Sequence, residues 1–562
     1  MLSGTIPTNL FCIPSLRRLF LSQNQFKGNL GDLHGRASSL LDTFDLSSNK
    51  LQGQFPMSVF ELRGLNLSID ATNTSVSSFS LPNITTLKLT SCNLTEFPDF
   101  LTYQSRLSYL DLSNNQIQGK IPNWIWKVRS LRYLNLSQNV LVEFERSLEN
   151  INSSLNVLDL HGNQLQGQIQ ILPPRATYLD YSNNKFSSVL PAQIGDFLQF
   201  AYFFSVSGNN FNGSIPKSIC SSLYLRVLDM SDNYLSGPIP KCLTQMSVSL
   251  GVLNLRQNNL SGIISDTFPK NCSLQTLDIN QNQVEGEVPQ SLGNCKRLEV
   301  VDIGNNQISG SFPCHLKNIS KLRVLVLRSN KFNGSIHCHK NNTGWPTLQI
   351  VDLASNNFSG ELHQTCLETW KGMQVVENEA PSKVKHLQFQ FLQFNPNHYQ
   401  DEITVTIKGL EWELVKILTV FTTIDISCNN FEGPIPEVIG TFKELYGLNF
   451  SHNAFTGPMP SFLGNLRQLE SLDLSSNYLS EASFENNAGL CGPPLKATCG
   501  LPPAKTDNPS DARSTINWNY ISAETGFCFG FGISVTLLIF WKRWRKWYFE
   551  RMDRALSWIF PC

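Results

Sequence analysis

One short phrase, L-x-L-x-x-N, recurs along most of this 562-residue chain and constrains the fold more than any other feature. Clear copies are LDLSNN, LNLSQN and LDLSSN, which end at Asn115, Asn139 and Asn477. Between Asn258 and Asn330 the asparagine returns every 24 residues. A fixed period of this size predicts that successive copies stack into a solenoid.

Each L-x-L phrase predicts one short strand, with its leucines facing the core and the residues between them facing the concave side. We expect the recurrent Asn to be buried and to bond backbone groups of neighbouring turns, because an unpaired buried amide is costly. The phrase that follows, as in LSGPIP from Leu235 to Pro240, adds a glycine turn and an extended proline segment. The predicted fold is a leucine-rich-repeat solenoid, a right-handed α/β-type superhelix with a parallel sheet on its concave face.

The Asn position marks 18 predicted units. Cys92 replaces Asn in one unit as a normal alternative, and Asp70 marks a degenerate unit. The positions are Asn24, Asn49, Asp70, Cys92, Asn115, Asn139, Asn163, Asn184, Asn209, Asn233, Asn258, Asn282, Asn306, Asn330, Asn356, Asn429, Asn453 and Asn477.

The period breaks once, between Asn356 and Asn429, where about 49 extra residues are inserted. We therefore predict an island at 361–417, between repeat blocks at 1–360 and 418–480. The alternation in ITVTI, Ile403–Ile407, predicts a strand inside the island. Insertions in solenoids often bind a ligand, but an island that only bridges the two blocks fits the sequence equally well.

The chain has 44 Lys and Arg residues against 44 Asp and Glu residues, which gives no basis for nucleic-acid binding. Charge is uneven at the C-terminal end, where residues 542–562 hold six basic and two acidic residues. The basic residues are Lys542, Arg543, Arg545, Lys546, Arg551 and Arg554.

The segment before this tail, Tyr520–Trp541, has a single charged residue, Glu524. About 20 mostly apolar residues span a bilayer, and a basic cluster marks the cytosolic side. We predict a transmembrane helix at 520–541 and a cytosolic basic tail at 542–562. The chain would then be a single-pass type I protein of the plasma membrane, with its repeats outside the cell.

Small residues recur every four positions along the predicted helix, at Ser522, Gly526, Gly530 and Ser534. Such a stripe lets two membrane helices approach closely, so it predicts pairing with a partner helix. Glycine is common in membrane helices, and an ordinary helix surface is the alternative.

Several of the 14 cysteines are spaced near the repeat length, including Cys220 with Cys242 and Cys272 with Cys295. We predict one disulfide between Cys314 and Cys338, and another between Cys491 and Cys499. The second would lie in a C-terminal cap at 481–499, which precedes a juxtamembrane linker at 500–519.

Three histidines near Cys314 and Cys338, at positions 315, 337 and 339, suggest zinc as an alternative. A disulfide is favoured in an oxidising compartment, so we predict no metal and no cofactor.

Many N-x-S/T sequons, together with the cysteines and the membrane segment, predict a glycosylated extracellular part. The predicted glycosylation sites are Asn73, Asn83, Asn152, Asn212, Asn318 and Asn341. The first seven residues, MLSGTIP, read as the tail of a repeat, so we expect a chain truncated at its N-terminus, without a signal peptide or a cap.

The repeats, the island, the phrase SFENNAGLCGPPLKATC, the membrane segment and the short tail together resemble the plant leucine-rich-repeat receptor-like proteins, which lack a kinase domain. Several stretches are similar to the Verticillium-wilt-resistance subgroup. They include CNLTEFPDFL at 92–101, LQIVDLASNNFSG at 348–360 and YQDEITVTIKGLEWELVKILTVFT at 399–422.

The resemblance implies a role in plant defence, in which the concave face and the island recognise a pathogen protein or peptide outside the cell. It also implies an adaptor receptor kinase paired through the membrane helix and a co-receptor kinase docked at the last repeats. The candidate ligand contacts are charged residues of the concave face: Arg226, Asp229, Arg256, Asp278, Glu299, Asp302, Arg323 and Arg328.

Other functions fit the same architecture. The chain could be a developmental peptide co-receptor, a wall-associated inhibitor of secreted hydrolases or a non-functional truncated paralogue. An enzyme is not predicted, because no nucleophile–base pair, metal spacing or kinase motif stands out.

Overall fold

The computed structural model describes residues 1–7, 9–10, 13, 15–28, 41–51, 84–145, 153–170, 172–337, 344–374, 387, 389–390, 398–400, 402–407, 410–414, 417 and 421–479. The chain divides into two compact units, Met1–Ala488 and Gly489–Cys562. Every described residue belongs to the first unit. The predicted cap, linker, membrane helix and tail lie outside the described residues.

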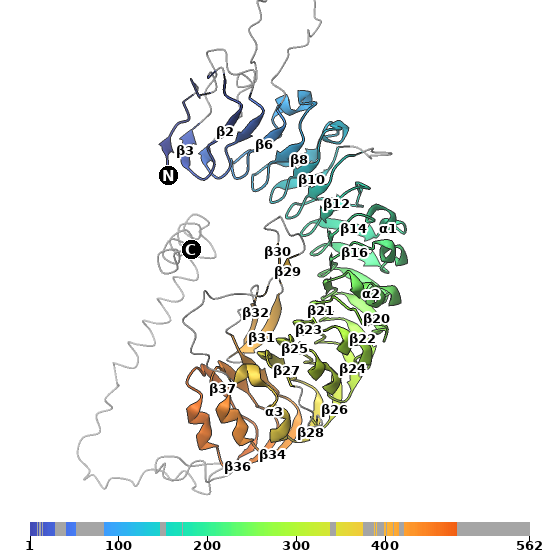
Figure 1. Cartoon of the computed structure of the whole chain (residues 1–562), viewed down its shortest axis with the longest axis vertical. Coiled ribbons are helices and arrows are strands. Elements are labelled where there is room, and N and C mark those ends of the chain that lie inside the picture. The colour runs from blue at the N-terminus through green and yellow to red at the C-terminus, as the bar shows by residue number, and fades with distance from the viewer. Residues whose placement is uncertain are drawn as a thin grey trace, which may run out of the picture. The chain divides into compact units, whose positions relative to one another are not determined.

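Among the described residues, seventeen three-residue strands form one parallel sheet, here called the main sheet. Its strands pair in chain order from β2 to β37, position by position, as in Val227 with Val252. The strands are β2 (Arg18–Phe20), β4 (Thr43–Asp45), β6 (Thr86–Lys88), β7 (Tyr109–Asp111), β9 (Tyr133–Asn135), β11 (Val157–Asp159), β13 (Tyr178–Asp180), β15 (Phe203–Ser205), β17 (Val227–Asp229), β19 (Val252–Asn254), β21 (Thr276–Asp278), β23 (Val300–Asp302), β25 (Val324–Val326), β27 (Ile350–Asp352), β33 (Thr423–Asp425), β35 (Gly447–Asn449) and β37 (Ser471–Asp473). Figure 1 shows these strands following one another along the coils. The predicted solenoid is confirmed.

A second, 12-stranded sheet holds the segments that follow the asparagines. Its strands are β12 (Gln166–Gly167), β14 (Lys185–Val189), β16 (Asn210–Gly213), β18 (Tyr234–Pro238), β20 (Asn259–Ile263), β22 (Gln283–Gly286), β24 (Gln307–Gly310), β26 (Lys331–Gly334), β28 (Asn357–Glu361), β34 (Asn430–Pro434), β36 (Ala454–Gly457) and β38 (Tyr478–Leu479). Nearer the N-terminus, β1 (Ser3–Gly4), β3 (Gln25–Gly28) and β5 (Lys50–Leu51) pair together, as do β8 (Gln118–Ile121) and β10 (Val140–Phe144).

Short helical turns follow the segments after the asparagines in many coils. They are α1 (Ile194–Phe197), α2 (Lys241–Gln245), α3 (Gln364–Leu367) and 3₁₀ turns at Asp99–Tyr103, Ile125–Lys127, Lys217–Ser221, Met246–Val248, Gln290–Asn294, Cys314–Asn318, Lys371–Met373, Glu437–Thr441 and Ser461–Asn465. Within the described ranges, no helix has both the length and the hydrophobicity to cross a bilayer.

The core is one continuous cluster, because each coil buries its leucines against those of the next. Leu134, Leu158 and Leu179, on neighbouring strands, are fully buried. Phenylalanines after the asparagines stack from coil to coil, as Phe332 does on Phe358 with ring centroids 5.8 Å apart. No coil could bury this surface alone, so the fold depends on stacking.

The recurrent asparagines form the predicted ladder. In Asn139, Nδ2 donates to the carbonyls of Leu112, Leu136 and Ser137, and Oδ1 accepts from the N–H of Ile117. One side chain thus bonds the backbone of two adjacent coils, which fixes their register.

The predicted count of 18 units is wrong by one in the main sheet. β4 pairs directly with β6, with Thr43 opposite Thr86, so no strand stands between them. The degenerate phrase at Asp70 therefore adds no strand there, and Asp70 itself lies outside the described residues. It lacks both the regular leucines and the asparagine that define the other units. Cys92 does occupy an Asn position, with Sγ 3.5 Å from the Leu46 carbonyl oxygen.

The island interrupts the chain without interrupting the main sheet, because β27 pairs directly with β33. It contributes two hairpins, β29 (Phe389–Gln390) with β30 (His398–Tyr399) and β31 (Ile403–Ile407) with β32 (Leu410–Leu414). The predicted strand at Ile403–Ile407 is confirmed. The predicted island start at 361 falls inside a coil, since Leu367, Trp370 and Met373 are buried in the main core.

Candidate functional site

The described part of the island packs on the main sheet: β31 lies against β23, β25 and β27, and β29 lies against β15, β17 and β19. Figure 1 shows the island strands beside this sheet. Ile403 and Val405 of β31 join a buried apolar cluster with Val300, Val324 and Ile350. These residues of the main sheet are β-branched and apolar, and the burial of their surface against β31 stabilises its docking.

A second apolar contact lies further toward the N-terminus. Phe389 of β29 is buried with Phe203, Val227 and Val252. Its ring lies over Gly251, where an added Cβ would come within 2.2 Å of the ring. Glycine at position 251 therefore leaves the space that the island uses to dock.

Polar contacts beside Phe389 orient the island on the sheet. The Tyr399 hydroxyl donates to Asp229 Oδ2 over 3.0 Å and accepts from Asn254 Nδ2 over 2.8 Å. Arg256 forms an ion pair with Glu402, with Nη2 and Oε2 3.0 Å apart. These bonds join residues about 145 to 170 positions apart in the sequence.

A polar cavity of about 290 Å³ opens where the island meets the sheet. The coils contribute most of its wall, and Tyr399, Gln400 and Glu402 of the island close one side. The wall includes four carboxylates, at Asp180, Asp229, Asp232 and Glu402, and the guanidinium of Arg256. We take this cavity, here called the island cavity, as the candidate binding site, because such sites are concave with a few convergent polar groups.

The carboxylates of this face belong to a repeated structural feature. The last residue of most main-sheet strands is Asp or Asn, and its Oδ1 accepts the backbone N–H two residues later. In Asp180 this bond goes to Ser182 over 3.0 Å, and the Ser182 hydroxyl donates to the same oxygen over 2.6 Å. The first role of these aspartates is therefore to stabilise the turn after each strand. Because the strands are parallel and in register, their carboxyl groups form a row across the concave face, here called the acidic row.

Burial shifts the pKa of these carboxyl groups upward. Burial, followed by the charge of Asp159, raises the pKa of Asp180 to about 6. Burial and the charge of Asp425 raise the pKa of Asp352 to about 7, although Arg328 opposes the shift. Removing water from like charges disfavours their ionised forms.

Bases appear at three positions where many other coils carry serine, namely His161, Arg256 and Arg328. Arg328 Nη1 lies 3.1 Å from Asp352 Oδ2, and Arg256 Nε lies 3.6 Å from Asp232 Oδ2. Each of these bases offsets the acidic row locally. His161 Nδ1 lies 2.7 Å from Asp159 Oδ1, in the place that a serine hydroxyl takes elsewhere.

The eight predicted ligand contacts fall into three environments. Asp229, Asp278 and Asp302 are buried. Arg256, Glu299, Arg323 and Arg328 are partly buried, while Arg226 is exposed. Only Asp229 and Arg256 of this set line the island cavity, so the structure brings two of the predicted residues together there. Ligand contact at all eight positions stays a prediction.

Tyr399, Glu402 and Asp180 were not among the predicted residues. Asp180 belongs to a column of turn residues and looks like its neighbours in the sequence. The island residues carry no periodicity that would relate them to a coil. Arg256 replaces the serine that many other coils carry, but Arg328 does so too and pairs with Asp352 of the sheet, so this signal alone does not locate the site.

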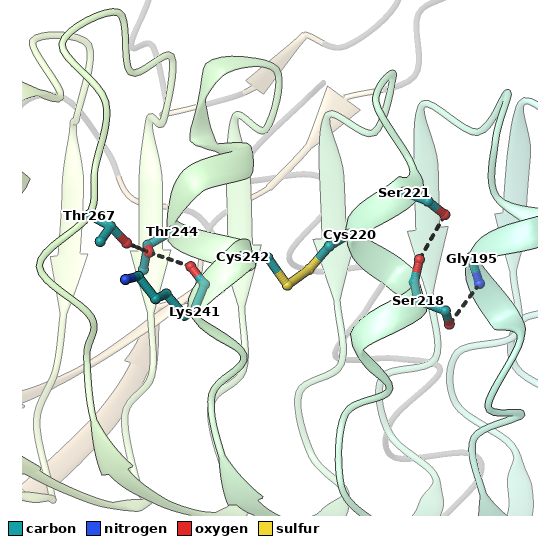
Figure 2. The surroundings of a disulfide bond; sticks show 8 residues. All are labelled: Gly195, Ser218, Cys220, Ser221, Lys241, Cys242, Thr244 and Thr267. Carbon is teal, nitrogen blue, oxygen red and sulfur yellow. Dashed lines mark hydrogen bonds between the residues drawn. A yellow bond between two sulfur atoms is a disulfide. The ribbon is translucent and has the colours of Figure 1, made fainter.

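Disulfides join adjacent coils where the cysteine spacing matches the repeat. Cys220 bonds Cys242, and Cys272 bonds Cys295. Figure 2 shows the first of these beside the turn at Lys217–Ser221 and α2. The Cα atoms of Cys220 and Cys242 are 5.9 Å apart. Cys314 is also disulfide-bonded, but Cys338 lies outside the described residues, so their pairing stays a prediction, as does Cys491–Cys499.

The disulfide at Cys314 removes one sulfur from the alternative zinc site. His315 Nε2 lies 3.0 Å from the Pro289 carbonyl oxygen instead. Within the described ranges, one other group of three could hold a metal ion, Asp159, His161 and Asp180, whose ligand atoms lie within 4.8 Å of one another. The turn geometry already accounts for that group.

The other predicted sites are only partly described. Asn212 and Asn318 are exposed, as glycosylation requires, and Asn73, Asn83, Asn152 and Asn341 lie outside the described residues. The helix-pairing residues Ser522, Gly526, Gly530 and Ser534 also lie outside them.

Comparison with known proteins agrees with this architecture. The leucine rich repeat family matches residues 82–141, 224–246, 249–271 and, as a two-copy form, 272–318. Receptor-like protein 6 of Arabidopsis thaliana is 40% identical over 441 residues, covering 78% of this chain and 39% of its own length. Receptor-like protein 54 of the same plant is 32% identical over 463 residues, covering 78% of this chain and 55% of its own length.

The chain is a leucine-rich-repeat protein of the plant receptor-like class. More narrowly, it belongs to the family of plant leucine-rich-repeat receptor-like proteins, as the resemblance predicted. It spans about half the length or less of such relatives. The Verticillium-wilt-resistance subgroup stays a prediction.

Solved structures with the same fold include receptor ectodomains. The structure of PEPR1 with AtPEP1 matches with a TM-score of 0.60 and 27% identity, over 85% of this chain and 64% of that one. The Arabidopsis receptor kinase HAESA, in complex with the peptide hormone IDA and the co-receptor SERK1, matches with a TM-score of 0.58 and 25% identity, over 85% and 77%.

Proposed function

We propose that this chain is a subunit of a cell-surface receptor that binds an extracellular peptide or protein at the island cavity. The observation that carries the proposal is the cavity itself, which exists because the island docks across the main sheet. A non-binding spacer would have no need for polar groups from both sides to converge on one space. The structure of PEPR1 with AtPEP1 and that of HAESA with the peptide hormone IDA support a binding role for this fold.

The signal would pass through partners. In this proposal Tyr520–Trp541 anchors the chain in the plasma membrane, and the stripe from Ser522 to Ser534 pairs with an adaptor receptor kinase. A co-receptor kinase docks near the last repeats, around β35 and β37. The HAESA complex with SERK1 supports the use of a co-receptor by proteins of this fold.

The ligand we favour is a pathogen-derived peptide or protein, which makes the protein a defence receptor. The alternative is a developmental co-receptor for an endogenous peptide, and the peptide hormone bound to HAESA favours it. The two functions share one site and differ in the source of the ligand. Application of the identified ligand to plants separates them, through defence outputs in one case and growth outputs in the other.

The binding proposal is tested with the full chain, expressed in plant cells and purified in detergent. A random 12-residue peptide library is selected on the wild type and on a variant in which a short Gly-Ser linker replaces residues 375–420. Because β27 pairs directly with β33, the variant should keep the solenoid.

We expect the wild type to enrich peptides that slow hydrogen exchange around Asp180, Asp229 and the island, and the variant to enrich none of them. Circular dichroism and surface display check that the variant folds. The proposal fails if no peptide is enriched on the wild type, or if the folded variant enriches the same peptides.

A further inference from the structure

We propose that the island cavity is a subsite for a basic side chain, so that the ligand presents an arginine or lysine to it. This inference rests on the proposed function and adds the chemical class that the cavity selects. It follows from the charges that line the cavity, from the burial and the bonding partners of Asp180, and from the aromatic side chains in the cavity wall.

The lining is acidic. Among the described residues of its wall, Asp180, Asp229, Asp232 and Glu402 face the single cation of Arg256. That guanidinium is already shared, because it lies 3.0 Å from Glu402 and 3.6 Å from Asp232. Asp229 has the Tyr399 hydroxyl and Ser231 as its partners. One arginine therefore offsets only part of the negative charge.

Asp180 is the carboxylate that we expect to pair with the cation of the ligand. Its side chain is buried, with Oδ1 bonded to Ser182 and Oδ2 accepting the Tyr178 hydroxyl over 3.1 Å. No ion pair with Lys or Arg is formed by Asp180 in the part of the chain that the structure describes, whereas Asp352 on the same face has Arg328. Burying a carboxylate without a permanent cation is costly, so a cation that enters the cavity recovers this cost.

Within the described ranges, the neighbours of Asp180 supply no permanent cation and only part of a titratable one. Asp159, on the neighbouring strand, adds a like charge that raises the pKa of Asp180. The charge of His161 lowers that pKa, but its ring is hydrogen-bonded to Asp159 and is therefore shared between the two carboxylates. Toward the island, the next carboxylate is Asp229. Asp180 thus stands between two acids at the edge of the cavity.

The shape suits the stem of a basic side chain. Phe203 and Tyr399 both line the cavity, and Phe203 stacks on Tyr178 with ring centroids 4.4 Å apart. Aromatic groups accept the methylene stem of lysine or arginine and attract the cationic end. A volume of about 290 Å³ is near the lower end of small-molecule sites, about 300 Å³, which fits one side chain better than a folded domain.

The probe is N-acetyl-arginine amide, compared with N-acetyl-citrulline amide, which has nearly the same shape but no charge. Binding to the full chain in detergent is measured by saturation-transfer NMR and calorimetry. We expect the arginine probe to bind at least tenfold more tightly than the citrulline probe. Its affinity should rise between pH 5 and pH 7 as Asp180 ionises, because its pKa is about 6.

Asp180→Asn removes the charge while keeping the turn, since Asn135 and Asn449 accept the same two bonds at this position in their coils. The matched control is Asp111→Asn, because Asp111 bonds Ser113 as Asp180 bonds Ser182 but does not line the cavity. We expect Asp180→Asn to lose at least tenfold in affinity for the arginine probe and Asp111→Asn to match the wild type.

Equal affinity for the arginine and citrulline probes overturns the proposed basic subsite. An equal loss of affinity for the arginine probe in Asp180→Asn and Asp111→Asn overturns it as well. If library peptides without basic residues occupy the cavity, the subsite is wrong and the receptor proposal stands. If the arginine probe binds through Asp180 but no library peptide is enriched, the subsite stands and the receptor proposal fails.

Discussion

At the residue scale, one asparagine per coil holds the register of the whole fold. Asn306 shows how: Nδ2 donates to the carbonyls of Ile279, Ile303 and Gly304, and Oδ1 accepts from the N–H of Val284. An apolar side chain of similar size would leave all four backbone groups without this partner in a dry interior.

We expect Asn306→Leu to lower the free energy of unfolding by about 1–3 kcal/mol, because buried backbone groups lose their hydrogen bonds. Urea denaturation followed by circular dichroism measures the loss. Gln307→Leu, at the exposed position next in the chain, is the control and should change stability little. A loss of the same size in both variants would contradict the role of the ladder.

His161 gives the same face a titratable base. Burial lowers its pKa, but the hydrogen bond and charge of Asp159 outweigh burial and raise the pKa to about 8. A raised histidine pKa adds stability that is fully present below its unfolded value of about 6.5 and is lost as pH rises through 8.

His161→Ser installs the residue that many other coils carry at this position. Relative to this variant, the wild type should gain on the order of 1 kcal/mol at pH 6, after allowance for partial exposure, and lose that gain by pH 9. Denaturant midpoints at the two pH values test this. A difference between the two proteins that is the same at both pH values would show that the His161–Asp159 pair does not titrate as described.

At the element scale, the island is held by a few contacts on one face. Phe389 over Gly251, Tyr399 on Asp229 and Arg256 with Glu402 connect it to coils far away in the sequence. The hairpin of β31 and β32 adds an apolar contact to Val300 and Ile350. We therefore expect docking of the island to be separable from folding of the coils.

Gly251→Ala tests that separation, because its Cβ would lie 2.2 Å from the Phe389 ring and would push β29 off the sheet. We expect faster hydrogen exchange in β29–β32 and unchanged exchange in the flanking strands. Gly464→Ala is the control, since its Cβ would meet nothing within 4 Å. Unchanged exchange in the island would mean that Phe389 does not position it.

At the scale of the whole molecule, stability is local, because each coil contacts mainly its neighbours. Disulfides between adjacent coils, such as Cys220–Cys242, reinforce single junctions in the stack. Asp229, which accepts a hydrogen bond from Tyr399, lies in β17, between Cys220 and Cys242 in the sequence. A weakened junction there should disturb the island cavity more than the distant repeats.

Replacing Cys220 and Cys242 together with serine should cost on the order of 3 kcal/mol at that junction, since the bond closes a loop of 22 residues. Hydrogen exchange should rise in β15, β17 and β19, and stay unchanged in β35 and β37. As a control, hydrogen exchange is measured for both proteins under reducing conditions. Reduction breaks the Cys220–Cys242 bond of the wild type, so its exchange should then approach that of the variant. A uniform rise along the whole chain would contradict local stability.

The coil could be predicted from the sequence, because one coil repeats one local pattern of leucine, asparagine and glycine. The predictions failed at Asp70, where that pattern decays, and at the island start, where a coil continues beyond residue 361. The sequence also located the island and its strand at Ile403–Ile407, since a break in period and an alternation are both local signals. Where the island docks, and that Asp180, Asp229 and Tyr399 share one cavity, became visible only in the folded chain. Those contacts join positions up to 170 residues apart through side-chain shape and charge, and no periodicity in the sequence encodes such a match.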